Sequence, residues 1–140
     1  MNTHMPDCLF CKIIKREIPS TKIYEDRNIF VFLDINPVNI GHTLVVPKDH
    51  WENIYTTPTK ILCEMMEIAK QLSIAIKTAT KADGINIEMN NEKAAGQLVS
   101  HAHLHVVPRF GDDGFTHWHG KRPYNEGEMQ EVADKIIRVF

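Results

Sequence analysis

The sequence predicts an α+β fold in which one long helix packs on an antiparallel sheet of about five strands, with a short helix near each end of the chain. Two observations lead to this prediction. Apolar residues recur every three or four positions over residues 61–79, which is typical of a long amphipathic helix. Short alternating or apolar segments with turn residues between them are typical of strands, and they cover residues 22–24, 29–33, 43–47, 85–90 and 99–109. Helices and strands do not alternate as they would in a doubly wound parallel sheet.

Length and composition favour a single domain of 140 residues with an ordinary core, because 43% of the residues are hydrophobic and 24% are charged. The net charge of −2 offers no basic excess for a nucleic-acid backbone, so no nucleic-acid partner is expected. No apolar run approaches transmembrane length and no signal peptide is evident, so we expect no membrane association. Three cysteines without the spacing of a disulfide framework favour a cytoplasmic location.

The N-terminal half contains a short helix, a hairpin and a strand. Residues 1–7 lack an apolar pattern, and we expect them to be disordered. A short helical stripe follows and ends before Pro19. Residues 22–34 read as a hairpin whose turn is 25–28, and Thr43–Pro47 is an apolar strand that follows a loop with Pro37 and Gly41.

The long helix is expected to start with Thr57 as N-cap and Pro58 as its first residue, and to end before Gly84. A strand at 85–90 and a loop at 91–97 lead to the segment 99–109. Residues 110–140 are expected to form a variable tail, in which His117 and His119 have no assigned role. Its final helix is expected to be capped by Asn125, and the apolar stripe comprises Met129, Val132, Ala133, Ile136 and Phe140.

The most unusual feature is the row of histidines at 101, 103 and 105, which alternates with apolar residues. On a strand, the three imidazoles would share one face. Such a row suits a metal site, nucleophilic or acid–base catalysis by neutral imidazole, or anion binding. One metal ion bound by all three is strained, because the outer Cα atoms would lie about 13 Å apart.

The segment His-Ala-His-Leu-His-Val-Val resembles the signature of the histidine triad (HIT) family, His-φ-His-φ-His-φ-φ with φ apolar. The resemblance extends to Gly96-Gln97 and Pro108-Arg109. It also includes Asp34-Ile35-Asn36-Pro37, the segment from Gly41 to Lys48, and Cys8-Leu9-Phe10-Cys11-Lys12, so that it covers most of residues 8–112 in the family's order.

The resemblance implies a nucleotide pocket. It assigns His103 as the nucleophile, and His105 and Gln97 as hydrogen-bond partners of the phosphate. His101 becomes either an orienting neighbour or a metal ligand. The remaining nucleotide-binding residues that it implies are Phe10, Phe32 and Ile35 at the base, Asp34 at the ribose, and Asn90 and Gly96 at the phosphates. His42, at the start of the apolar strand, is a further candidate that either faces the nucleotide or is a structural histidine with its hydrogen bonds satisfied. Many relatives carry Ser or Thr after the glutamine, whereas this chain has Leu98, so a hydroxyl contact to the phosphate or leaving group is missing.

The pair Cys8 and Cys11 forms a C-x-x-C motif, which by itself fits zinc, redox chemistry or chance. In zinc-bearing HIT members such a pair is joined by two histidines, and the matching residues here are His50 and His101. The resemblance therefore implies a structural Zn²⁺ site of Cys₂His₂ type.

The activity implied by the resemblance is cleavage at the α-phosphate of a purine nucleoside phosphoramidate or dinucleoside polyphosphate, through a nucleotidyl-histidine that water resolves to a nucleoside monophosphate. A homodimer is also implied. Two other functions stay open. One is a metal-dependent hydrolase that uses the histidines as ligands, and the other is a nucleotide-binding protein without catalysis.

Overall fold

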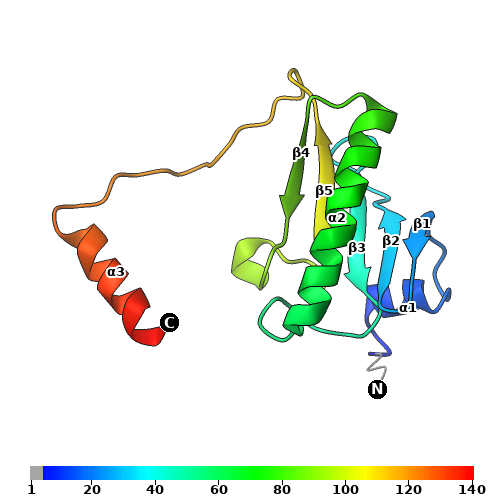
Figure 1. Ribbon diagram of the computed structural model, residues 1–140, viewed down its shortest axis with the longest axis horizontal. Coiled ribbons are helices and arrows are strands. Elements are labelled where there is room, and N and C mark those ends of the chain that lie inside the picture. The colour runs from blue at the N-terminus through cyan, green and yellow to red at the C-terminus, as the bar shows by residue number, and fades with distance from the viewer. Residues whose placement is uncertain (1–4) are drawn as a thin grey trace.

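The computed structural model describes residues 5–140 and contains a five-stranded antiparallel sheet of order β1-β2-β3-β5-β4 (Figure 1). The strands are β1 (Lys22–Glu25), β2 (Ile29–Leu33), β3 (Thr43–Pro47), β4 (Gly84–Glu88) and β5 (Leu104–Arg109). The expected α+β architecture is therefore confirmed. Both central strands β2 and β3 are buried almost throughout, and this explains why their sequences are continuously apolar.

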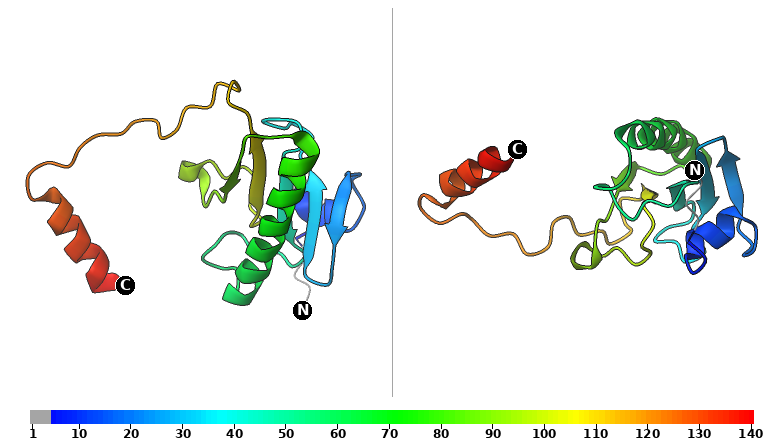
Figure 2. Two further views of the ribbon diagram at one scale, coloured as in Figure 1. Left: turned by 45° about the horizontal axis from the view of Figure 1, so that its top comes forward. Right: turned by 90° about the horizontal axis from the view of Figure 1, so that it is seen from below.

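Each face of the sheet is covered by a helix. Helix α2 (Thr59–Thr80) packs over β3 and β5 and closes the larger core, in which Met65 and Ala69 meet Val31, Val45 and Val106. The short helix α1 (Leu9–Ile14) covers the opposite face. Its Phe10 and Ile13 pack against a second core, formed by Phe30, Phe32, Leu44 and Val46. Figure 2 shows α2 and α1 on the two sides of the sheet.

The ends of α2 differ from the prediction. Thr57 does not cap the helix, because its hydroxyl donates to the Asn53 carbonyl at 2.7 Å, and Pro58 takes the N-cap position. The helix ends at Lys81, which adopts the left-handed conformation with φ of 58°, and Gly84 opens β4 instead of stopping the helix. A lysine was not recognisable as the C-cap, since glycine and asparagine are the usual residues there.

The histidine segment also differs from the prediction. Strand β5 begins at Leu104, so only His105 lies on a regular strand, while His101 and His103 precede it in an irregular extended segment. His105 is paired with Leu44 in the register of β3 and β5, which places it on the α1 face of the sheet. The apolar residues Leu104 and Val106 face α2, as the alternation predicted.

The two ends of the described chain complete the fold. Residues 5–7 form a turn in which the Cys8 N–H donates to the Met5 carbonyl at 3.1 Å, so the expected disorder does not extend to them, and residues 1–4 lie outside the described residues. Helix α3 (Glu128–Val139) forms as expected, but Gly127 takes the N-cap position instead of Asn125. Figures 1 and 2 show α3 at the end of an extended segment, apart from the rest of the chain. Within residues 5–140, none of the helices combines the length and apolar character needed to cross a membrane.

Candidate functional site

A pocket of about 480 Å³ lies on the α1 face of the sheet, a volume suited to a nucleoside-sized ligand. It brings together residues from distant parts of the sequence. Six of the predicted nucleotide-site residues and two of the three clustered histidines line it: Phe10, Phe32, Asp34, Ile35, Asn90, Gly96, His103 and His105. The rim is open and apolar, because Ile35 and Leu98 are 86% and 96% exposed.

His103 is held in one tautomer by the backbone. Its Nδ1 lies 2.7 Å from the carbonyl oxygen of His101, and a carbonyl only accepts, so Nδ1 carries the proton. In the neutral ring the lone pair is then on Nε2. The ring of Phe10 meets His103 edge to face, with 5.0 Å between centroids, and fixes its orientation. The ring of His103 therefore has a fixed orientation and a defined unprotonated nitrogen, Nε2.

His42 and His105 form a hydrogen-bonded pair with a similarly defined direction. The Val38 N–H donates to His42 Nδ1 at 3.1 Å, so the neutral His42 ring carries its proton on Nε2. That Nε2 lies 2.9 Å from His105 Nδ1 and donates to it, and the neutral His105 ring then carries its own proton on Nε2. In the neutral state His105 can therefore donate a hydrogen bond from Nε2, whereas the Nε2 of His103 carries no proton.

Burial lowers the pKa of all three imidazoles. For His42 and His103 the loss of solvent is the main cause. For His105 the loss of solvent, followed by the neighbouring His103 and His42, lowers the pKa to about 4. The three rings are therefore neutral at pH 7, the state in which the tautomers described above apply.

Asp34 and Gly96 are fixed by the loops on which they lie. Asp34 Oδ1 accepts the Asn36 N–H at 2.8 Å, which leaves the carboxylate at the pocket edge, and its Oδ2 lies 3.8 Å from His42 Nε2. Gly96 has a φ of 88°, which a residue with a side chain adopts only at a cost, so glycine is required for the turn before the histidine segment.

Gln97 is not among the residues that line the pocket, and its contact with phosphate stays a prediction. Its Nε2 donates to the carbonyls of Glu52 and Val99 at 2.6 and 3.0 Å, and its Oε1 accepts the Glu92 N–H at 2.7 Å. Both amide hydrogens are thus used by the backbone. Gln97 braces three loop segments around the pocket, a role that neither its polarity nor its position in the sequence could distinguish from ligand binding.

Cys8, Cys11, His50 and His101 converge beside the pocket, with one ligand atom from each within 4.8 Å of the others. His101 Nε2 donates to the Pro47 carbonyl at 2.8 Å, and its Nδ1 faces Cys8 Sγ at 3.4 Å and Cys11 Sγ at 3.7 Å. His50 Nδ1 lies 3.5 Å from Cys11 Sγ. Tetrahedral zinc with ordinary bond lengths would set such S···N distances at about 3.6 Å, so the donor set fits a structural zinc ion.

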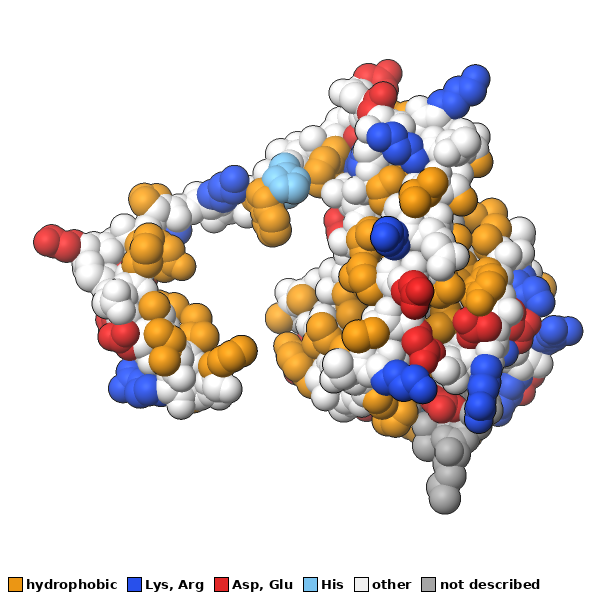
Figure 3. All heavy atoms as spheres, viewed as in Figure 1, with side chains coloured by type: hydrophobic (Ala, Val, Ile, Leu, Met, Phe, Trp, Pro, Cys, Tyr) orange, Lys and Arg blue, Asp and Glu red, His pale blue; other side chains and the backbone are white. Residues whose placement is uncertain are grey.

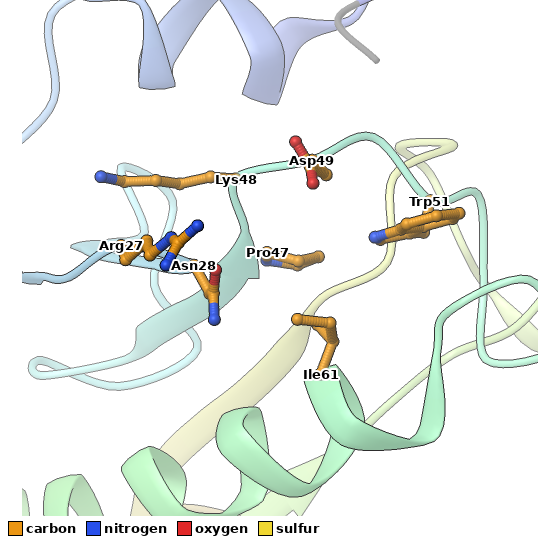
Figure 4. A pocket seen from close by; sticks show the side chains of 7 residues that line it. All are labelled: Arg27, Asn28, Pro47, Lys48, Asp49, Trp51 and Ile61. Atoms are coloured by element: carbon orange, nitrogen blue, oxygen red, sulfur yellow. The ribbon is translucent and has the colours of Figure 1, made fainter. Parts of the chain in front are cut away.

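A second cleft, of about 350 Å³, opens between the β1–β2 turn, the segment after β3 and the start of α2 (Figure 4). Lys48 Nζ is paired with Glu25 Oε1 at 2.7 Å, and Asn28 Nδ2 donates to Glu64 Oε2 at 2.7 Å. No histidine or cysteine is among the residues that line this cleft, whereas His103 and His105 line the first pocket. Its lining consists of Arg27, Asn28, Pro47, Lys48, Asp49, Trp51 and Ile61.

Sequence reasoning missed the part of the site that is built from backbone groups. The Val38 N–H and the carbonyls of His101 and Pro47 fix the histidine tautomers, and backbone groups leave no signal in residue identity. For His42 the sequence left open a role facing the nucleotide and a structural role, and the side chain is only 4% exposed and hydrogen-bonded to His105. The position of His42 directly before the apolar strand Thr43–Pro47 was the feature of the sequence that indicated its burial.

Comparisons with known proteins agree with this geometry. The profile of the HIT domain matches residues 15–112. An uncharacterized HIT-like protein of Borreliella burgdorferi is 45% identical over 135 residues, covering 94% of this chain and 97% of the relative. Adenosine 5′-monophosphoramidase HNT1 of Saccharomyces cerevisiae is 44% identical, covering 73% of this chain and 62% of the relative. Adenylylsulfatase HINT3 of Arabidopsis thaliana is 42% identical, covering 77% and 55%.

Solved structures share the fold. SMU.412c of Streptococcus mutans superposes with a TM-score of 0.90 at 41% identity, covering 99% of this chain and 88% of that one. A HIT family protein of Bacillus subtilis gives 0.87 at 37%, covering 96% and 97%. A zinc-bound histidine triad protein of Mycobacterium smegmatis gives 0.75 at 34%, covering 96% and 98%. With the histidine pocket in place and the family profile matched over most of its length, this chain belongs to the HIT domain family.

Proposed function

We propose that this protein is a nucleotide hydrolase or transferase that cleaves at the α-phosphate of a purine nucleoside phosphoramidate or dinucleoside polyphosphate. One observation carries the proposal. The His101 carbonyl holds the proton on His103 Nδ1, so that the neutral ring offers its Nε2 lone pair at a pocket of nucleoside size. A buried imidazole fixed in this way is suited to attack phosphorus.

The nucleotide would bind along the α1 face. The base would lie between the aromatic rings of Phe10 and Phe32 and the exposed Ile35. The ionised Asp34 would accept hydrogen bonds from the ribose hydroxyls, because a carboxylate accepts and cannot donate. The α-phosphate would then lie over His103 and His105, with Asn90 and Gly96 lining the same end of the pocket.

Catalysis would proceed in two displacements. His103 Nε2 attacks the α-phosphorus, a P–N bond forms, and the bond to the leaving group breaks as that group departs with the electron pair and takes up a proton from solvent. His105 donates its Nε2–H to a phosphate oxygen and stabilises the charge that develops there. Water then attacks phosphorus, the P–N bond breaks, and a nucleoside monophosphate leaves with His103 neutral again.

The names of two relatives support this class of reaction. A monophosphoramidase and an adenylylsulfatase, the yeast and Arabidopsis proteins, both act on an adenylyl group but release different leaving groups. The pocket of this chain meets the leaving-group side with Leu98 instead of a hydroxyl-bearing residue. An apolar rim favours neither leaving group, so both substrates are included in the test. As the family resemblance implies, we also expect the chain to act as a homodimer.

Zinc would be structural in this proposal. Cys8, Cys11, His50 and His101 would hold it, and the ion would tie α1 and the segment after β3 to the histidine segment. Because these four residues complete a tetrahedral set, no ligand position would remain for substrate. A zinc-bound relative supports this assignment.

A second candidate function rests on another cluster. Asp34, His42 and His105 also bring three ligand atoms within 4.8 Å, as a water-activating metal would require. Metal binding there would displace the proton that His42 and His105 share at 2.9 Å. The hydrogen-bonded pair already satisfies both nitrogens without a metal ion, so the nucleophilic mechanism is favoured.

The test measures AMP release from adenosine 5′-phosphoramidate and from diadenosine tetraphosphate, with wild type and His103→Ala compared in the presence and absence of a chelator. We expect wild type to release AMP and His103→Ala to release none. After chelation, the rate of AMP release by wild type, divided by the amount of protein that stays folded, should be unchanged. Release that disappears on chelation while circular dichroism shows an intact fold would support the metal-dependent hydrolase. AMP binding without any turnover would show a nucleotide-binding protein.

A further inference from the structure

A groove of about 320 Å³ between the turn after α1 and strand β1 adjoins the pocket that His103 and His105 line. The ring of Phe10 lies 5.0 Å from that of His103, and Ile13 is one turn further along α1. The turn that follows α1 leads from there to β1. The pocket therefore extends from the histidines past Phe10 and continues as the groove. The two cavities share four lining residues, Ile13, Ile18, Pro19 and Ser20.

The proposed pose of the nucleotide directs one edge of the base at this groove. The α-phosphate would lie over His103 and His105, and the base would lie beside Phe10 and Phe32. The edge of the base farthest from the ribose then points towards the residues that the two cavities share. In adenine this edge carries the exocyclic amine. A substituent on that amine would therefore enter the groove.

The four shared residues suit a short aliphatic substituent. Ile13 and Ile18 pack with Phe30 in the second core, so their side chains are held in place. Pro19 adds a further apolar surface. The half-buried Ser20 contributes a hydroxyl that can accept the remaining N–H of a substituted amine. A chain of methylene groups would thus be covered here, whereas an unsubstituted base would leave these residues in water.

The far side of the groove is positively charged. It is lined by Arg16 and Lys22, and no acidic residue is among the described residues that line it. Lys22 Nζ and Arg16 Nη2 lie 2.9 and 3.6 Å from Glu25 Oε2, and Lys48 Nζ lies 2.7 Å from its Oε1. Lys48 and Lys22 lower the pKa of Glu25 to about 2, so this carboxylate is ionised at pH 7. Three cations share one carboxylate, which leaves an excess of two positive charges.

The backbone holds one of these cations in a defined position. Arg16 adopts the left-handed conformation with φ of 63°, which costs free energy for a residue with a side chain. The Arg16 N–H donates to the Ile13 carbonyl at 2.9 Å, and the Glu17 N–H donates to the Lys12 carbonyl at 2.9 Å, so the turn is fixed. Figure 3 shows Lys and Arg side chains, with acidic side chains among them, at the edge of the molecule where β1 lies. An arginine placed in advance loses less freedom when it binds an anion.

We propose that the base subsite continues into this groove, and that the protein prefers purine nucleotides whose exocyclic amine carries a short aliphatic arm ending in a carboxylate. The apolar shared residues match the arm, and Arg16 and Lys22 match the carboxylate. The inference rests on the proposed nucleotide pocket and names the class of base that the pocket takes.

The test measures Kd by calorimetry for the full chain with AMP, N6-(2-carboxyethyl)-AMP and the neutral amide N6-(2-carbamoylethyl)-AMP. We expect the acid to bind about fourfold more tightly than the amide, because each exposed ion pair changes affinity about twofold. The double variant Arg16→Gln/Lys22→Gln should bind the acid and the amide equally. Lys70→Gln removes an exposed cation from α2, on the other face of the sheet, and should keep the full preference.

Two results would overturn the inference and leave the nucleotide pocket in place. In the first, AMP binds but the acid binds no more tightly than the amide. In the second, the preference persists in the double variant, so that the carboxylate is bound elsewhere. Each single variant, with about half the preference expected, repeats the comparison if circular dichroism shows that the double variant is unfolded.

A third result would overturn more than the inference. If none of the three nucleotides binds, the pocket is not a nucleotide site, and the proposed function fails together with its base subsite. Because Kd is measured without turnover, a protein that binds AMP but hydrolyses nothing would contradict the proposed function alone, and the comparison of acid with amide would still decide the inference.

Discussion

Replacing His42 by asparagine should reduce turnover without changing any residue that lines the pocket. The amide of asparagine lies where His42 Nδ1 lies, so it can still accept the Val38 N–H, but it is too short to reach His105. His105 then loses the donor that keeps its Nδ1 unprotonated. The tautomer with the proton on Nδ1 becomes accessible, and in that tautomer His105 cannot donate from Nε2 to the phosphate.

The size of the effect follows from one buried hydrogen bond between neutral groups at 2.9 Å. Such a bond contributes about 1 kcal/mol net, and a loss of this size in the transition state lowers kcat about fivefold. Because the lost donor acts on developing charge, KM should change less than kcat.

The assay is the steady-state release of AMP from adenosine 5′-phosphoramidate at pH 7, with His42→Gln as the matched variant. Glutamine is long enough to reach His105 with its Nε2–H, so we expect His42→Gln to stay within about twofold of wild type, since the donor to His105 is kept. Urea unfolding of both variants checks that each is folded. Equal activities of the two folded variants would show that His42 does not set the tautomer of His105.

Three further predictions concern stability. Removing zinc with a chelator should lower the Tm by several degrees, because the ion would tie α1 to the histidine segment. If the chelator does not change the Tm of protein that was first loaded with zinc, the site is not structural. Gly41→Ala should cost about 2 kcal/mol in urea unfolding, since φ is 102° and a Cβ would lie 2.9 Å from Thr80 Cγ2; Gly114→Ala, with open space at its Cβ, is the control for positive φ alone. The folded pKa of His105 is about 4, below its unfolded value of about 6.5, so stability is full above pH 6.5 and decreases as the pH falls towards 4. These two values correspond to a loss of about 2 kcal/mol between pH 7 and 5, which solvent screening of the partly exposed ring reduces to about 1 kcal/mol. His105→Leu should remove this part of the pH dependence.

The fold was predictable because its elements carry strong local patterns. The period of α2 and the apolar sequences of β2 and β3 each reflect a buried face, and the structure confirms them. The helix ends were less predictable. Thr57 has the identity of an N-cap, but a tertiary contact with Asn53 uses its hydroxyl, and the backbone at Lys81 adopts a conformation that its side chain does not favour.

The sequence predicted which residues come together where residue identity suggests the chemistry, as for His103 in the pocket and Cys11 in the cysteine–histidine cluster. It was not predictable where a side chain has two equivalent uses. Gln97 could bind phosphate or the backbone with the same amide, and only the positions of Glu52 and Val99 decide between these uses. The irregular backbone at His101 and His103 was equally hidden, because β5 begins at Leu104, later than the alternation indicates.

His101 connects the cysteine cluster to the nucleophile through a single residue. Its Nδ1 faces Cys8 and Cys11, while its carbonyl accepts the hydrogen bond that His103 Nδ1–H donates. In the proposed mechanism His103 forms a bond to phosphorus, so its ring would gain positive charge and the hydrogen bond to that carbonyl would strengthen. A cobalt ion in place of zinc would sense this change at one of its own ligands. The visible absorption of the cobalt-substituted protein would then provide an optical reporter of the covalent intermediate during a single turnover.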